Sequence, residues 1–161
     1  MSNRGAGVLH IHPATVEHLA FIVEGNRRLA EETERLRLDV ATLREGVLAL
    51  LDGRAPGRYW IAELDGRVVG QLAVTFEWSD WRNRMVWWIQ SVYVTPEARG
   101  HGVFRALYAN VRREAQLAGA GGLRLYVDTT NTRAQAVYAT LGMNGDHYRV
   151  FEEMFERPSH L

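Results

Sequence analysis

The sequence contains no cysteine and no lysine, and neither sign of charge is in excess. Without cysteine, the chain has no thiolate nucleophile, no cysteine-based zinc site and no disulfide framework. Its 161 residues bury enough surface on folding to be stable without such cross-links. The 19 basic residues, all arginine, balance 19 acidic ones, so the net charge is zero. A neutral chain has no overall field to recruit nucleic acid or an anionic membrane, and we expect it to bind neither.

Long apolar runs and targeting signals are also absent from the sequence. No segment approaches the ~18 consecutive apolar residues that a membrane span requires. The N-terminus lacks the apolar stretch of a secretory signal. Because no repeat, low-complexity tract or linker interrupts the chain, we expect a single domain over residues 1–161. We expect this domain to be cytoplasmic and to bind no metal.

Hydrophobic periodicity predicts an α/β domain that begins with a strand and two helices. Residues 8–12 are typical of a short strand, and Thr15 suits the N-cap of a helix that breaks near Gly25. In residues 36–50, apolar side chains recur at steps of three and four, which indicates a second helix that ends at Gly53. Both helices therefore precede the main run of strands.

The middle of the chain changes to the period of strands. Residues 59–64 and 67–78 are joined by Asp65-Gly66, the dipeptide that best suits a type I′ hairpin turn. After a polar turn, residues 85–94 are rich in aromatic and β-branched side chains and add a third strand. We therefore expect an antiparallel meander of three strands.

The last third of the chain alternates helices with short strands. An amphipathic helix stops at Gly119, and residues 123–128 follow as an apolar strand. Since a helix separates this strand from residues 85–94, the two strands could lie parallel as a βαβ unit. A final helix over about residues 133–141 precedes residues 148–155, which could return as an edge strand.

The sharpest motif lies between a strand and a helix, at residues 92–104, VYVTPEARGHGVF. Its glycines, Gly100 and Gly102, let the backbone approach a ligand closely. Unpaired amides at a helix start carry partial positive charge and can bind phosphate, and Arg99 would add a charge-assisted contact. The third glycine of a dinucleotide fingerprint and the Lys-Ser/Thr of a P-loop are missing. Spacing alone therefore leaves two interpretations, a phosphate-binding loop and a tight turn.

A second motif, YVDTTNTRAQAVYATLGM at residues 126–143, has the order strand, loop, helix, glycine. Together the two motifs resemble the GCN5-related N-acetyltransferase (GNAT) superfamily, and the resemblance extends over about residues 9–156. It implies a central mixed, largely antiparallel sheet with helices on both faces. It also implies acetyl-coenzyme A (acetyl-CoA) as the cofactor, a primary amine of a small molecule or peptide as the acceptor, and a homodimer as one expected assembly.

The resemblance assigns the cofactor's pyrophosphate to the first motif. The family signature Arg/Gln-x-x-Gly-x-Gly/Ala falls on Arg99, Gly102 and Phe104. Phe104 departs from the small residue of the signature, so its side chain must turn into the core while its backbone amide stays available. The implied pyrophosphate contacts are Arg99, Gly100, Gly102, Val103, Phe104 and Arg105.

The resemblance also assigns four positions around the thioester. The main chain of Val92 and Val94 would pair with the pantetheine arm as a strand does. Asn131 would bond to the cofactor arm or fix the loop beside it, and Tyr138 would protonate the departing thiolate. Each side chain has a structural alternative, since Asn131 could be a turn or helix N-terminal residue and Tyr138 a core aromatic.

The catalytic base is the position that the sequence leaves open. An amine attacks a thioester only as the free base, and Gln90 stands where many family members place a glutamate. Gln90 could position a water, through which Glu77 or Asp80 could take the proton or hold the substrate cation. The structural alternatives are an arginine partner across the strands for Glu77 and a solvated turn for Asp80.

Two adjacent tryptophans and the missing glutamate shape the remaining expectations. Trp87 and Trp88 must point to opposite faces of their strand, so one can be in the core while the other lines a pocket. An aromatic wall near a carboxylate would suit a cationic or aromatic amine.

Because Gln90 cannot act as a base, a second function stays open, a coenzyme A-binding sensor or scaffold without turnover.

Overall fold

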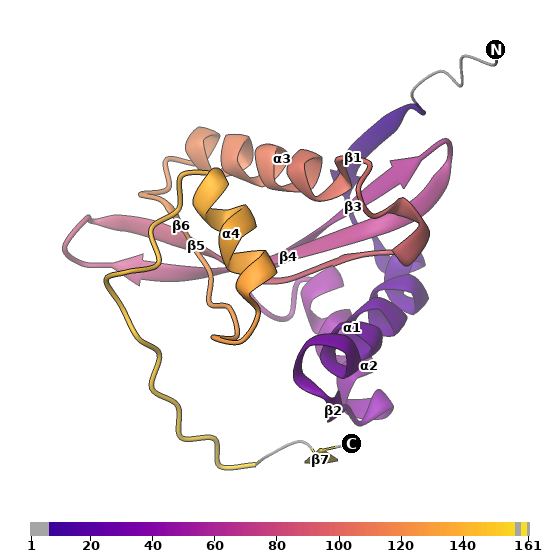
Figure 1. The fold of residues 1–161 in the computed structure, drawn as a ribbon, viewed down its shortest axis with the longest axis horizontal. Helices are drawn as coiled ribbons and strands as arrows, with labels where there is room; N and C mark the ends of the chain where they lie inside the picture. Colours follow the sequence, from indigo (N-terminus) through magenta and orange to yellow (C-terminus); the bar gives the residue numbers. More distant parts are fainter. Residues whose placement is uncertain (1–6, 157–158, 161) are drawn as a thin grey trace.

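The computed structural model describes residues 7–156 and 159–160, and a five-stranded sheet lies at its centre (Figure 1). The strand order is β1-β3-β4-β5-β6, in which β5 and β6 are parallel and the other neighbours antiparallel. This confirms the expected mixed, largely antiparallel sheet. Its strands are β1 (Leu9–Pro13), β3 (Arg58–Leu64), β4 (Arg67–Ser79), β5 (Arg84–Val94) and β6 (Leu123–Arg124).

Helices cover both faces of this sheet (Figure 1). One face carries α1 (Leu19–Glu34) and α2 (Val40–Leu51), and the other carries α3 (Val103–Leu117) with α4 (Thr132–Thr140) beside it. None of the helices in the described part of the chain is long and apolar enough to cross a membrane. The short elements are the 3-10 helices η1 (Val16–His18) and η2 (Pro96–Ala98) and a separate antiparallel pair, β2 (Leu36–Arg37) with β7 (Ser159–His160).

The predicted meander is confirmed, including its first turn. Asp65 and Gly66 have φ values of 51° and 77°, and two successive positive φ values are what a type I′ turn requires. The turn pairs Leu64 with Arg67 and sets the register of β3 on β4. Local sequence therefore determines this hairpin.

The predicted helix break at Gly25 is wrong, because α1 continues through this residue to Glu34. A Cβ atom at Gly25 would lie 2.5 Å from Oε1 of Gln71, a fully buried side chain of β4. Nε2 of Gln71 donates to the Ile22 carbonyl at 3.1 Å and to Oδ1 of Asn26 at 3.0 Å. The glycine thus provides room for a polar contact between helix and sheet, and it does not end the helix.

Trp87 and Trp88 point to opposite faces of β5, as adjacent residues in a strand must. Trp87 is buried under α3, where its ring stacks on Trp60 at 6.1 Å between centroids and meets Phe76 edge-on at 5.1 Å. Trp88 points to the opposite face, beyond the cover of α1 and α2, and stays half-buried. The expectation of one core tryptophan is therefore met, and a pocket role for Trp88 stays a prediction.

The C-terminal third differs from the prediction in two places. The strand predicted at residues 123–128 is limited to β6, since its pairing with β5 stops after Arg124. Residues 148–155 form no strand and lie exposed, so the predicted edge strand is wrong. The reason is that a strand needs a hydrogen-bonded neighbour, and nothing in the described chain lies alongside these residues as one.

Candidate active site

A gap opens between β5 and the chain that follows β6. The two strands pair at Trp87 with Leu123 and at Trp88 with Arg124, and there the ladder ends. β5 continues to Val94, while the other side runs through residues 125–131 into α4. Because both segments continue without pairing, the peptide groups on this edge of β5 are left for another partner.

A bulge in β5 decides which amides face the gap. The Trp87 amide donates to the Gly122 carbonyl, toward β6, whereas the Thr95 amide donates to the Val69 carbonyl, toward β4. In a regular strand these two odd-numbered amides would face the same side. The register shifts at Gln90, which has no partner between the pairs Ile89–Val74 and Ser91–Ala73, so the alternation is reversed beyond it.

This reversal turns the amides of Val92 and Val94 into the gap. Since the Thr95 amide faces β4, the amides of even-numbered residues before it face the other way. The carbonyl of Val94 points the same way and accepts a hydrogen bond from Nε of Arg99 at 3.0 Å. The open edge of β5 therefore offers main-chain groups in the pattern of a strand waiting for a neighbour.

The loop at the start of α3 presents a second set of amides. Gly100 and Gly102 both have a φ of 79°, a left-handed conformation that side chains disfavour. The Gly102 carbonyl accepts from the Ala106 amide, so the amides of residues 103–105 precede the first helical hydrogen bond. They carry the partial positive charge of a helix start, and no heavy atom lies within 4 Å of where either glycine would carry a Cβ.

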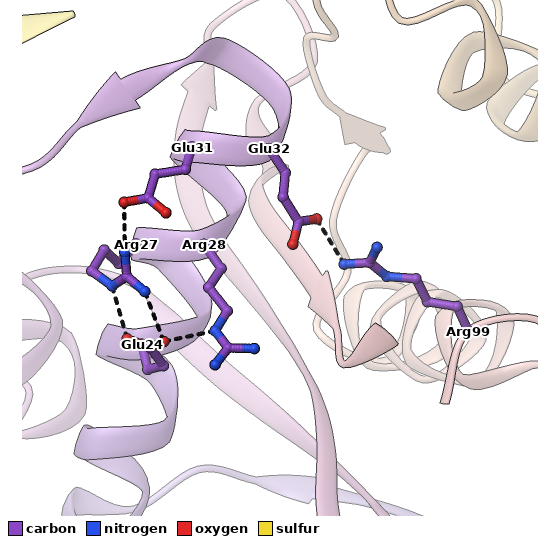
Figure 2. Close-up of polar contacts among 6 residues, drawn as sticks. All are labelled: Glu24, Arg27, Arg28, Glu31, Glu32 and Arg99. Carbon is purple, nitrogen blue, oxygen red and sulfur yellow. Dashed lines mark hydrogen bonds and ion pairs between the residues drawn. The ribbon is translucent and has the colours of Figure 1, made fainter. Parts of the chain in front are cut away.

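Arg99 is held against α1 and does not extend over the loop (Figure 2). Its Nη2 forms an ion pair with Oε2 of Glu32 at 2.8 Å, and its guanidinium lies 5.7 Å from the ring centroid of Tyr93. Arg99 therefore joins the loop to α1, a contact that sequence spacing does not reveal because Glu32 is 67 residues away. A phosphate would have to compete with Glu32 for this side chain.

The same face of α1 carries a chain of charged side chains (Figure 2). Glu24 accepts hydrogen bonds from Arg27 and Arg28, and Arg27 also reaches Glu31. The hydrogen bonds from Arg27 and then Arg28 lower the pKa of Glu24 from 4.5 to about 2. The cluster lies within the helix, and the lowered pKa of Glu24 means that this carboxylate keeps its charge until acidic pH.

Two aromatic rings from different helices meet beside the loop. Phe104 of α3 lies 5.9 Å from Tyr138 of α4 between ring centroids, in an edge-on arrangement, and 6.2 Å from Tyr108. The Phe104 side chain therefore packs toward the core, as its departure from the signature required. Burial raises the pKa of Tyr138, so its hydroxyl stays protonated at neutral pH and can donate a proton.

The exposed face of β4 and β5 carries the residues considered for proton removal. Nε2 of Gln90 donates to Oγ1 of Thr75 at 2.6 Å. Glu77 accepts from Nε1 of Trp88 at 2.8 Å, and its other oxygen forms an ion pair with Arg124. The structural alternative for Glu77, an arginine partner across the strands, is thus present in the structure.

Two further residues border this face. Asp80 lies exposed in the turn after β4, where it accepts from the Trp81 amide, away from the gap. The ring of Tyr126 lies 6.2 Å from that of Trp88, whose Nε1 donates to Glu77. Burial, followed by the negative charges of Glu152 and Glu34, raises the pKa of Tyr126.

Asn131 is the N-cap of α4. This is the structural role that the sequence offered as the alternative to a cofactor contact. Its Oδ1 accepts from the Ala134 amide at 3.1 Å, while its Nδ2 is a donor that the cap does not use. The loop before it is fixed by Gln135, whose Nε2 donates to the Asp128 and Thr129 carbonyls. Gln135 was not among the predicted site residues, although a polar side chain at the first turn of a helix after a loop is a signal for such a contact.

A possible metal site lies at the other edge of the sheet. His12, His18 and Glu63 have potential ligand atoms within 4.8 Å of one another, and Nε2 of His12 lies 3.2 Å from Oε1 of Glu63. Nδ1 of His18 accepts from the Thr15 amide at 2.9 Å, as the cap of η1. The cluster ties the start of α1 to β1 and β3, and it contributes nothing to the gap.

Comparison with known proteins bears on the family of this chain. A sequence model of the acetyltransferase (GNAT) family matches residues 24–143. A solved structure described as a possible acetyltransferase from Clostridium difficile 630 is 37% identical and covers 93% of this chain and 99% of its own, with a TM-score of 0.85. The expected resemblance is therefore confirmed.

Two other proteins are similar to this chain. The thialysine N-epsilon-acetyltransferase of Bos taurus is 36% identical over 75 residues, which are 47% of this chain and 44% of the bovine enzyme. The match thus spans less than half of that curated relative. An aminoglycoside N-acetyltransferase, solved in complex with CoA, is 19% identical, covers 96% of this chain and 99% of its own, and shares the fold with a TM-score of 0.77.

Proposed function

Because the chain belongs to the acetyltransferase (GNAT) family, we propose that it transfers an acetyl group from acetyl-CoA directly to a primary amine. The observation that carries this proposal is the convergence of two sets of main-chain donors on one gap. The bulge at Gln90 turns the amides of Val92 and Val94 toward the gap, and the Gly100–Gly102 loop presents amides at the start of α3. Together they suit a ligand with an amide-bearing arm and a diphosphate, which describes coenzyme A.

The cofactor's two parts are assigned to these two sets of donors. The pantetheine arm would lie along Val92 and Val94 as an added strand, and Asn131 could reach it with Nδ2. Acetyl-CoA supplies the acetyl group as a thioester. The loop is proposed to hold the diphosphate. The residues assigned to it are Arg99, Gly100, Gly102, Val103, Phe104 and Arg105.

Tyr138 is proposed as the general acid. Its hydroxyl would donate a proton to the sulfur as the carbon–sulfur bond breaks and the carbon–nitrogen bond forms. The raised pKa of Tyr138 keeps that proton in place at neutral pH. A main-chain amide near Val92 would stabilise the negative charge that develops on the carbonyl oxygen. No covalent enzyme intermediate is needed, in keeping with the absence of cysteine.

Proton removal from the amine is assigned to the face of β4 and β5 that carries Glu77 and Gln90. Deprotonating a lysine-like amine with a pKa of ~10.4 at pH 7 costs about 4–5 kcal/mol, so a proton acceptor must be near. Gln90 could position a water that takes the proton from the amine and passes a proton on to Glu77. Arg124 forms an ion pair with Glu77 and therefore competes for this carboxylate. The alternative role of Glu77 is to hold the cationic acceptor before it reacts.

The acceptor is proposed to be a small molecule or peptide with a flexible cationic amine. Trp88 contacts the Glu77 carboxylate and has the ring of Tyr126 beside its own, and aromatic faces near a carboxylate suit a cation. The name of the bovine relative, a thialysine N-epsilon-acetyltransferase, supports a lysine-like amino acid as the class to test first. The same proposal places the enzyme in the cytoplasm, where a chain without disulfides is at no disadvantage.

A second function, coenzyme A binding without turnover, is favoured by one observation. Both oxygens of Glu77 are engaged, by Trp88 and Arg124, and Gln90 cannot accept a proton as a base. Release of free thiol from acetyl-CoA, measured against a panel of primary amines, separates the two functions. Turnover with any amine excludes the sensor, whereas binding of acetyl-CoA without thiol release against the whole panel excludes the transferase.

The binding half of the proposal is tested by exchanging one glycine for alanine at each end of α3. Gly102 and Gly119 both have positive φ, 79° and 73°, and no atom would contact a Cβ at either position. Gly102→Ala strains the loop and moves its amides, so we expect CoA binding to weaken at least about tenfold by calorimetry. Gly119→Ala carries similar strain and should bind as the parent does. Equal affinity in all three proteins would contradict the assignment of the loop.

A further inference from the structure

Glu77 and Arg124 form an ion pair on the sheet face that carries the residues considered for the acceptor. Nη1 of Arg124 donates to Oε1 of Glu77, and Nε1 of Trp88 donates to the other carboxylate oxygen at 2.8 Å. Because these three side chains contact one another, they share the face of the sheet opposite α3. The side chains of Arg124 and Glu77 are 31% and 44% exposed. A small molecule can therefore reach the pair from solvent.

Much of the hydrogen-bonding capacity of this pair is unused. A guanidinium has five N–H donors, and among the residues that the structure describes the Arg124 side chain donates to Glu77 alone. Each oxygen of Glu77 accepts one hydrogen bond from the described chain and has a second lone pair. The two side chains hold each other in place, so less rotamer freedom is lost when a ligand binds. The pair offers a fixed positive group beside a fixed negative one.

The two charges of a free amino acid complement this pair. Its carboxylate suits the guanidinium of Arg124, which binds carboxylates through two parallel N–H donors. Its α-ammonium suits the Glu77 carboxylate. A diamine would leave the free donors of Arg124 without an acceptor, and a residue inside a peptide carries neither charge at its α-carbon. The arrangement of charges therefore favours a free amino acid over a diamine or an internal peptide residue.

The position of the pair along β5 selects which amine can react. Arg124 pairs with Trp88, whereas the amide proposed to stabilise the thioester oxygen lies near Val92. Four positions of strand, one of them in the bulge, span roughly 10–13 Å. An α-amine held at Glu77 could not reach the thioester. An amine on a flexible four-carbon stem could, because the long side chains of the ion pair cover part of the distance.

We propose that Arg124 and Glu77 bind the α-carboxylate and the α-ammonium of a free amino acid whose side chain ends in a primary amine. The inference rests on the proposed acetyl transfer and names the acceptor class for it. Arg124 is the specificity-determining residue, because the carboxylate is what separates this acceptor from a diamine. Glu77 takes its alternative role and holds a charge of the acceptor. Trp88 is a positioning residue that acts through Glu77.

Acceptors that differ only at the α-carbon test the proposal on the full chain. Cadaverine is lysine without its carboxylate, and lysine amide keeps the α-ammonium but has a neutral amide in place of the carboxylate. Thiol release from acetyl-CoA gives kcat/KM for each acceptor. We expect the parent enzyme to favour lysine over cadaverine by at least about tenfold, since a hydrogen-bonded charge pair is lost with the carboxylate. Lysine amide should behave as cadaverine does.

Two variants separate recognition from a structural role of the ion pair. Arg124→Gln should lower the ratio of kcat/KM for lysine to that for cadaverine at least about tenfold, and Arg124→Lys, which keeps the charge without the planar fork, should recover part of it. Glu77→Gln breaks the same ion pair but should lower kcat/KM for both acceptors, because both carry an ammonium there. Arg84→Gln, at an exposed arginine of β5 outside the pair, should leave the ratio unchanged.

The outcomes distinguish this inference from the proposed reaction. Equal kcat/KM for lysine and cadaverine in the parent enzyme, or the same ratio in Arg124→Gln and Glu77→Gln, would overturn the inference and leave acetyl transfer standing. Turnover with other amines but with neither lysine nor cadaverine would overturn it as well. Binding of acetyl-CoA without thiol release for any amine would overturn the proposed transfer and the inference together.

Discussion

At the scale of single residues, Tyr138 is where burial and proposed chemistry coincide. Its ring is fixed against Phe104, and burial keeps its hydroxyl protonated by raising its pKa. If this hydroxyl protonates the thiolate, Tyr138→Phe should lower turnover by about 10²–10⁴ while the Kd for CoA stays unchanged. Steady-state thiol release and calorimetry measure the two quantities.

The control for this prediction is a neighbouring tyrosine. Tyr108 is buried against the other side of Phe104, and Tyr108→Phe removes a hydroxyl without touching the proposed acid. It should keep the turnover of the parent enzyme. Because the pKa of Tyr138 is raised above 10, the basic limb of the rate profile should lie above pH 10 and disappear in Tyr138→Phe. Full turnover by Tyr138→Phe would remove the role.

Glu24 gives the clearest pH dependence of stability. Its pKa is about 2 in the folded chain against 4.5 for the ordinary side chain, because Arg27 and Arg28 hold its charged form. A lowered pKa adds stability above pH 4.5, and this contribution fades as the pH falls toward 2. The side chain is 46% exposed, so solvent screening keeps the contribution below about 1 kcal/mol.

Urea unfolding of Glu24→Gln beside the parent protein checks this assignment. The variant should be less stable at pH 7 and should approach the parent as the pH falls from 4.5 toward 3. Glu17→Gln, an exposed glutamate outside this cluster, serves as the matched control and should leave the pH profile unchanged. A constant difference between Glu24→Gln and the parent at every pH would show that the ion pairs do not cause the lowered pKa.

At the scale of elements, Gly25 in α1 and Gly46 in α2 form a natural pair. Both glycines lie inside helices, but a Cβ at Gly25 would meet Gln71 at 2.5 Å, whereas Gly46 has nothing within 4 Å. Gly25→Ala should therefore destabilise the fold by about 1–3 kcal/mol through overpacking. Gly46→Ala should stabilise it by up to about 1 kcal/mol through helix propensity. Thermal unfolding gives both values, and similar changes in the two variants would refute the packing role of Gly25.

The sequence predicts the elements that local chemistry determines. The Asp65-Gly66 turn, the meander and the glycine-ended helix α3 all follow from positive φ values and periodicity over a few residues. The continuation of α1 through Gly25 depends on Gln71, 46 residues further along, and no local pattern contains that contact. A helix break at a glycine and a close approach at a glycine give the same sequence signal.

The candidate site likewise has residues whose position the sequence predicts and contacts that it does not predict. The loop glycines and Phe104 lie as their motif predicts, since the motif itself encodes the turn and the helix start. The partners of Arg99 and Glu77 are not predictable, because Glu32 and Arg124 come from remote elements that only the fold brings together. The edge strand at residues 148–155 is absent for a different reason, because a strand requires a partner and sequence propensity does not supply one.

At the scale of the whole molecule, ligand binding should appear as stability. A ligand that binds only the folded chain adds about 2.7 kcal/mol at one hundred times its Kd. For a chain of this size, about 2–4 °C per kcal/mol converts this to a rise in Tm of roughly 5–11 °C with CoA. Differential scanning calorimetry measures the shift, and pantetheine, which lacks the diphosphate, should give a smaller one. An unchanged Tm in saturating CoA would argue against the cofactor.

The balanced charge of the whole chain leaves the binding of an anionic ligand to local features. With a net charge of zero there is no general attraction for phosphates, so the amides at the start of α3 and those on the open edge of β5 must hold the ligand themselves. The site is therefore specific to a ligand that spans both sets of donors. This is the central claim of the proposed function.

Amide resonances of ¹⁵N-labelled protein, followed during titration with CoA, test this claim most directly. We predict that CoA shifts the amides of Gly100, Gly102 and Phe104 together with those of Val92 and Val94, and that pantetheine shifts the two valines alone. Saturating CoA that leaves the residue 100–105 amides unmoved would contradict the account.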